Sequence, residues 1–149
     1  MNDEQIQAYC IGLGMPKALI ERAKLIHALY GKLGINDISD VFISEYVKED
    51  GERSFENLWF FADKHVMEAK QFATEIDLDM APSTVVSYID LKQTEYDLEH
   101  STGASRLFVT ATLPLGMGVG LTFKASRENC DYLKTIVIKY LMPRLQAPS

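Results

Sequence analysis

Residues 105–142 decide the fold, and they read SRLFVTATL (105–113), VGLTFKAS (119–126) and RENCDYLKTIVIKYLM (127–142). In the first two segments apolar residues alternate with polar ones, which is typical of half-buried antiparallel strands. In the third, apolar residues recur at three- and four-residue steps, which predicts an amphipathic helix over 126–142. Ser126 is the expected N-cap of this helix. The stretch therefore predicts a β-hairpin whose sheet is covered by one C-terminal helix.

The N-terminal part of the chain predicts two helices. The first, within 3–13, is broken by Gly12 and Gly14. Pro16 suits the first turn of the second helix, and Gly34 suits its C-terminal cap. The apolar residues of the second helix form a broad stripe, so we expect it to bury one face.

Between these ends the apolar pattern changes to that of strands. Segment 63–73 could form a helix or a short strand, and we favour the strand. Four other segments either alternate between apolar and polar residues or are strongly apolar, and we expect them to be strands. They are 41–49, 55–61, 75–80 and 84–98. With the last hairpin this gives about seven strands and predicts the α+β class.

Composition describes an ordinary globular protein. The chain has 149 residues, of which 47% are hydrophobic and 24% are charged, enough to bury one core. Its net charge of −6 disfavours binding to nucleic acids and stable association with anionic membranes. Its two cysteines, outside any metal-binding spacing, fit a reducing compartment. The first ten residues lack the basic and apolar regions of a signal peptide, so we expect a cytoplasmic protein.

The order of elements resembles that of the bacterial type of pleckstrin-homology-like (PH-like) domain. The segments that carry the resemblance are FENLWFFADKHVMEA (55–69), VVSYIDLKQTEYD (85–97), SRLFVTATLP (105–114) and GVGLTFKASRENCDYLKTIV (118–137). The resemblance implies an antiparallel strand roll or barrel capped by the C-terminal helix over 126–142. It places this PH-like domain at 39–145 and a helical extension at 1–38. A helix-grip fold is the alternative, since it also wraps a curved sheet around a C-terminal helix.

The resemblance implies a scaffold for protein contact or self-assembly. The lipid-binding members of the family carry clustered Lys and Arg in the first hairpin. Here that hairpin is VKEDGERSFENL (47–58), with four acids and only Lys48 and Arg53. Phosphoinositide binding is therefore not expected.

Candidate catalytic groups are few. Glu75, Asp77 and Asp79 alternate along one strand face, where carboxylates could hold a hard cation or act as acid and base. A solvated edge strand gives the same pattern and is the preferred interpretation. Cys130 could be a nucleophile near a helix start, but its place in the apolar stripe favours a core thiol. We expect no enzyme activity, cofactor or metal.

Aromatic residues on the second faces of the strands suggest an interaction surface. These residues are Trp59, Phe61, Tyr88, Tyr96 and Phe108. Aromatic side chains are enriched at the centres of protein interfaces. The sequence thus predicts a non-catalytic binding module that contacts another protein or a second copy of itself. The alternative is a carrier that holds a small apolar ligand or lipid between the curved sheet and the last helix.

Overall fold

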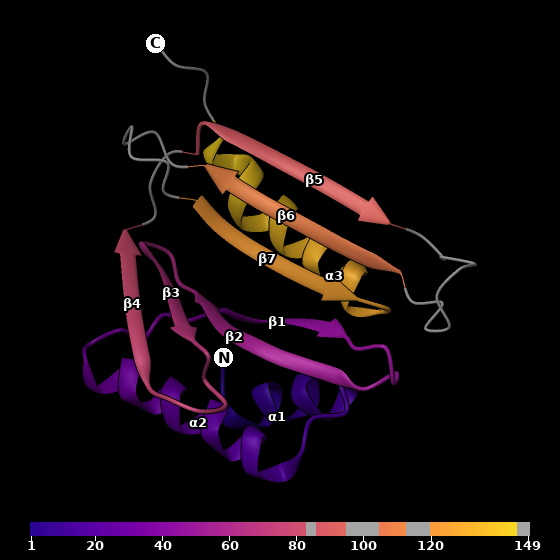
Figure 1. The fold of residues 1–149 in the computed structure, drawn as a ribbon. Helices are drawn as coiled ribbons and strands as arrows, with labels where there is room; N and C mark the ends of the chain where they lie inside the picture. Colours follow the sequence, from indigo (N-terminus) through magenta and orange to yellow (C-terminus); the bar gives the residue numbers. More distant parts are fainter. Residues whose placement is uncertain (83–85, 95–104, 113–119, 146–149) are drawn as a thin grey trace. The chain divides into compact units, whose positions relative to one another are not determined.

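The computed structural model describes residues 1–82, 86–94, 105–112 and 120–145 (Figure 1). Within them lie three α-helices and seven strands. The helices are α1 (Asp3–Gly12), α2 (Lys17–Lys32) and α3 (Asn129–Ile136). The strands are β1 (Asp40–Val47), β2 (Arg53–Phe61), β3 (His65–Lys70), β4 (Asp77–Pro82), β5 (Tyr88–Thr94), β6 (Arg106–Thr112) and β7 (Gly120–Ser126). The predicted α+β class is confirmed. Segment 63–73, for which we favoured a strand over a helix, contains strand β3.

The strands form two antiparallel sheets, one in the order β1-β2-β3-β4 and the other in the order β5-β6-β7. The chain divides into two compact units. The first comprises Met1–Ile43 and Phe55–Ser83, and the second comprises Ser44–Ser54 and Thr84–Ser149. The N-terminal helices therefore belong to the same unit as β3 and β4, rather than forming an extension that ends at residue 38. The tip of the β1–β2 hairpin belongs to the second unit.

In the first unit, α1 and α2 cover one face of the four-stranded sheet (Figure 1). The register pairs Leu58 with Ala69 and Phe60 with Met67, and all four side chains join the core beneath the helices. Burying these side chains against the helices removes apolar area from water, which is the main stabilising term. Strand β2 carries apolar residues on both faces, and the two helices bury the face that holds Leu58 and Phe60.

The local signals of α2 lie at its ends. Pro16 is the extended N-cap residue and not part of the first turn as predicted, while Gly34 follows the end of the helix at Lys32 with a φ of 93°, a conformation that favours glycine. The amide of Ile35 donates to the carbonyl of Tyr30 at 3.1 Å, which closes the helix end.

In the second unit, α3 packs on one face of the β5-β6-β7 sheet, against β6 and β7 (Figure 1). Five residues of β6 and β7 on that face are buried, namely Leu107, Val109, Ala111, Phe123 and Ala125. The predicted apolar stripe of the helix is buried as well, and it consists of Cys130, Leu133, Ile136, Val137, Tyr140 and Leu141. The sheet and its covering helix are thus confirmed for this unit.

The start of the last helix differs from the prediction. The α-helix begins at Asn129 rather than at Ser126, and it continues as a π-helical turn (Val137–Leu141) and a 3-10 turn (Met142–Arg144). Ser126 is still the last residue of β7, and its hydroxyl donates to the Glu45 carboxylate. The strand extends through Ser126, and Arg127 and Glu128 separate it from the first helical residue, so Glu128 occupies the N-cap position and Ser126 lies too early to cap the helix.

Candidate functional site

The second unit carries a pocket with a volume of about 360 Å³. We call it the basic pocket, because three of its lining side chains are cations. It is lined by Glu45, Tyr46, Lys92, Thr94, Arg106, Leu107, Phe108, Lys124 and Ala125. These residues come from the end of β1 and from all three strands of the second sheet. Their separation in sequence means that only the folded unit brings them together.

Strand register builds one wall of the pocket. Lys92 lies directly opposite Phe108 on the neighbouring strand, and Phe108 lies opposite Lys124 on the next one. Paired residues of adjacent strands project from the same face. Phe108 is 40% exposed, so its ring lies on the open side of the sheet with a lysine on each flanking strand.

The Lys124 ammonium lies near two aromatic rings. Its Nζ atom is 5.8 Å from the ring centroid of Tyr46 and 5.9 Å from that of Phe108. A cation within about 6 Å of an aromatic centroid is attracted by the ring quadrupole. These contacts hold the positive charge of Lys124 inside the pocket instead of leaving it free to extend into solvent.

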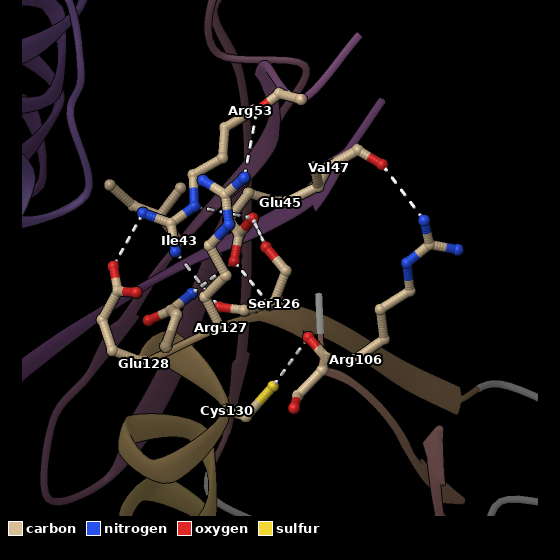
Figure 2. A network of polar contacts seen from close by, with 12 residues as sticks. Ile43, Glu45, Val47, Arg53, Arg106, Ser126, Arg127, Glu128 and Cys130 are labelled. Carbon is tan, nitrogen blue, oxygen red and sulfur yellow. Dashed lines mark hydrogen bonds and ion pairs between the residues drawn. The ribbon is translucent and has the colours of Figure 1, made fainter. Parts of the chain in front are cut away.

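A buried ionic network supports the pocket at Glu45, which is fully buried (Figure 2). The carboxylate of Glu45 accepts hydrogen bonds from the Ser126 amide at 2.7 Å and from Asn129 Nδ2 at 3.1 Å. It also accepts the Ser126 hydroxyl and forms an ion pair with Arg53 at 3.3 Å. Each carboxylate oxygen therefore has two partners, which is what a buried charge requires.

Arg53 extends the network toward α3. Its Nη1 atom is 2.8 Å from the carboxylate of Glu128, and its Nη2 donates to the Ser126 carbonyl at 3.1 Å. Burial alone would raise the pKa of Glu128, but the hydrogen bond from Arg53 holds that pKa below its usual value. Arg53 thus pairs with two carboxylates, and the network ties the β1–β2 hairpin tip to the β7–α3 junction inside the second unit.

Arg106 joins the basic pocket to the same hairpin tip. Its Nη2 atom donates to the Val47 carbonyl at 3.4 Å (Figure 2). A second, more open hollow of about 560 Å³ lies beside it. It is lined by Tyr46, Val47, Lys48, Glu49, Asp50 and Arg106. Arg106 and Tyr46 border both hollows, so a ligand in the basic pocket could extend toward the hairpin.

The predicted aromatic surface separates into two groups. Phe108 and Tyr88 lie on the exposed face of the second sheet, with Tyr88 61% exposed. Trp59 and Phe61 are buried, so they are core residues and do not contribute to an exposed surface. Tyr96 lies outside the described residues. Of the four predicted positions that the structure describes, Phe108 is the one that lines the basic pocket.

The alternating acids Glu75, Asp77 and Asp79 are exposed. The last two lie on β4, at the edge of the four-stranded sheet, and Asp79 pairs with Lys70 at 3.0 Å. Among the described residues, no group of three or more His, Cys, Asp or Glu side chains is arranged to hold a metal ion. The arrangement agrees with a solvated edge strand carrying charge.

Both cysteines are buried. Burial, together with the nearby charge of Glu45, raises the pKa of Cys130 to about 11, and burial raises that of Cys10 to about 11. The Cys130 thiol donates to the Ser105 carbonyl at 3.5 Å (Figure 2). A thiol protonated at neutral pH and closed off from solvent is a poor nucleophile.

Sequence reasoning did not single out Glu45 or the three pocket cations, and it named Arg53 only as one of two basic residues in the first hairpin. The sequence did contain a signal that these cations lie on the outer faces of their strands. Strand alternation puts Arg106 on the same face as Phe108, and it puts Lys124 on the face opposite that of Phe123. What alternation cannot give is the register, which sets Lys92, Phe108 and Lys124 in one row. The burial of Glu45 has no local signal, since its partners are 8 to 84 residues away.

The fold and the pocket define an α+β protein of two antiparallel sheets with a basic, aromatic-lined pocket on the three-stranded one. Comparisons with protein-family models, curated proteins and solved structures gave no match. No α-helix in the described part of the chain has the length and apolar character needed to cross a membrane.

Proposed function

We propose that the protein is a non-catalytic interaction module whose contact surface is the basic pocket. The observation that carries the proposal is the exposed row of Lys92, Phe108 and Lys124, with Tyr46 and Arg106 beside it. Tyr and Arg are enriched among the interface residues that dominate binding energy, and Phe among interface residues generally. The volume of about 360 Å³ is large enough to receive side chains of a partner.

The surroundings of the pocket support binding more than catalysis. Its one carboxylate, that of Glu45, is buried and shared among Arg53, Ser126 and Asn129. A general base needs a free lone pair within reach of its substrate, and here the network occupies that carboxylate. The proposal keeps the PH-like resemblance as its scaffold and the cytoplasm as its location, because two buried, unpaired cysteines suit a reducing compartment.

The carrier alternative has less support. It requires an apolar cavity between the second sheet and α3. The facing side chains Val109, Phe123 and Leu133 are fully buried, and α3 packs on β6 and β7 there. Protein interiors are packed about as densely as organic crystals, so side chains that face each other in this way leave little space for a lipid.

Photo-crosslinking in cells tests the proposal. A benzophenone amino acid replaces Phe108, Tyr46 or, as a control, Ile11, which is 59% exposed on α1. We expect the two pocket positions to give the same discrete protein adduct, identified by mass spectrometry, and the Ile11 position to lack it. An adduct at twice the mass of the chain would identify the partner as a second copy. If the pocket positions yielded no adduct, or one shared with Ile11, the proposal would be rejected.

A further inference from the structure

We propose that the basic pocket binds an acidic segment of a partner protein, with Asp or Glu side chains contacting Lys92, Arg106 and Lys124. This inference rests on the proposed function and names its ligand chemistry. The protein as a whole carries a net charge of −6, yet three cations converge on one pocket. The local charge of the pocket is thus opposite to the net charge of the protein. The pocket attracts anionic groups and repels cationic groups, whereas the rest of the surface does the reverse.

The single acid in the lining does not cancel these cations. Glu45 is fully buried and pairs with Arg53, whose single charge is shared with Glu128. Even counted in full, this one carboxylate leaves the lining with three positive charges against one negative charge. Lys92 and Arg106 are exposed residues, so their charges are accessible to a ligand.

The spacing of the cations suits a peptide. Two strand spacings separate Lys92 from Lys124, about 10 Å between their backbones. Side chains on one face of an extended peptide are about 7 Å apart, a distance that two flexible lysines can match. The planar fork of Arg106 suits a carboxylate.

The same contacts disfavour other polyanions. Single-stranded nucleic acids bind by stacking bases on free aromatic faces. Here the Lys124 ammonium is near both the Tyr46 and the Phe108 ring, so these rings hold a cation. An anionic membrane would meet a protein of net charge −6 and be repelled. An acidic segment needs no base stacking, and it is small enough to meet mainly the positive lining of the pocket, because salt screens the more distant acids of the surface.

The test is a fluorescence anisotropy titration of the full chain with a labelled decapeptide of alternating Glu and Thr. We expect saturable binding that weakens as salt is added, because salt screens exposed charges. The matching Gln–Thr decapeptide should not bind. The double variant Lys92→Gln/Arg106→Gln should bind the Glu–Thr peptide roughly five- to tenfold more weakly, the combined effect of two exposed ion pairs.

A matched control removes two positive charges elsewhere. Lys17→Gln/Lys32→Gln makes the same charge change at exposed positions of α2 and should leave binding unchanged. Arg106→Lys should retain more of the affinity than Arg106→Gln. The inference is overturned if the Gln–Thr peptide binds equally well, if both double variants lose the same affinity, or if oligothymidine or phosphatidylserine vesicles bind more tightly than the peptide. A protein adduct at Phe108 in the crosslinking experiment, with no peptide binding here, would overturn the acidic ligand and leave the proposed function standing.

Discussion

At the scale of single residues, Glu45 holds the second unit together. It is a carboxylate with no exposure, and its oxygens face Arg53, Ser126 and Asn129. Such a group stabilises only while every partner is present, because removing one side leaves an uncompensated charge in a medium of low dielectric. The same residue lines the basic pocket, so it couples stability to the shape of the site.

Glu45→Ala should lower the free energy of unfolding by about 3–5 kcal/mol, because it removes the buried acceptor of Ser126 and Asn129 and one of the two carboxylates that pair with Arg53. Urea unfolding followed by circular dichroism measures this loss. Glu52→Ala is the control, since Glu52 is an exposed acid of the same hairpin and its removal should cost less than about 0.5 kcal/mol. Equal losses in the two variants would contradict the role of the network.

Cys130 gives a pH prediction. Burial first, and then the charge of Glu45, raises the pKa of its thiol from 9.0 to about 11 in the folded protein. Between pH 9 and 11 the unfolded chain therefore releases a proton that the folded chain keeps, so the free energy of unfolding falls as pH rises. Cys130→Ala removes this contribution, and the stability gap between wild type and variant should shrink between pH 8 and 10.5. Urea unfolding at each pH measures the gap, and a constant gap would contradict the prediction.

At the scale of elements, α2 is fixed to the first sheet by Tyr30. The Tyr30 hydroxyl is 3.2 Å from the carbonyl of Glu68 and 3.2 Å from that of Asp79, on β3 and β4. Its ring meets Phe60 edge to face, with centroids 5.9 Å apart. Tyr30 thus joins α2 to three strands, because its hydroxyl contacts β3 and β4 and its ring contacts β2.

Tyr30→Phe should destabilise the protein by about 1 kcal/mol, because the ring stays packed while the buried hydroxyl and its hydrogen bond are lost. Tyr30→Ala should cost about 3–5 kcal/mol, since it also leaves a cavity. Thermal unfolding and urea unfolding measure both variants. Tyr88→Phe is the control, because Tyr88 is 61% exposed, and it should change little. A Phe variant as unstable as the Ala variant would show that the hydroxyl dominates over packing.

At the scale of the whole molecule, the chain passes between the two units at 43–44, 54–55 and 83–84. Strands β1 and β2 each contribute residues to both units. Because a strand cannot lose half of its backbone pairing without weakening the rest, we expect the units to unfold in a single cooperative transition.

Hydrogen exchange with mass spectrometry tests this cooperativity. Peptides from α2 report on the first unit and peptides from α3 on the second. Glu45→Ala alters only the second unit directly, yet protection should fall in both sets of peptides by the same free energy. A loss confined to the α3 peptides would mean that the units unfold separately.

Much of the architecture follows from the sequence because its signals are local. Alternation in 105–112 and 120–126 gave the last hairpin, and the apolar stripe from Cys130 to Leu141 gave the covering helix. Pro16 and Gly34 marked the ends of α2, because each restricts the backbone in its own position. These features depend on residues close in the chain, so periodicity and caps can reveal them.

The site was decided by tertiary structure. Glu45 reaches Ser126 and Asn129 across more than 80 residues, and the strand extends through Ser126, so the helix begins at Asn129 instead of where the sequence placed its start. The row of Lys92, Phe108 and Lys124 exists only through strand register. By itself the sequence determined the helices, the strands and the α+β class. Which charges are buried, and which converge on one pocket, depends on long-range contacts, because pairing and dielectric environment are properties of the folded neighbourhood.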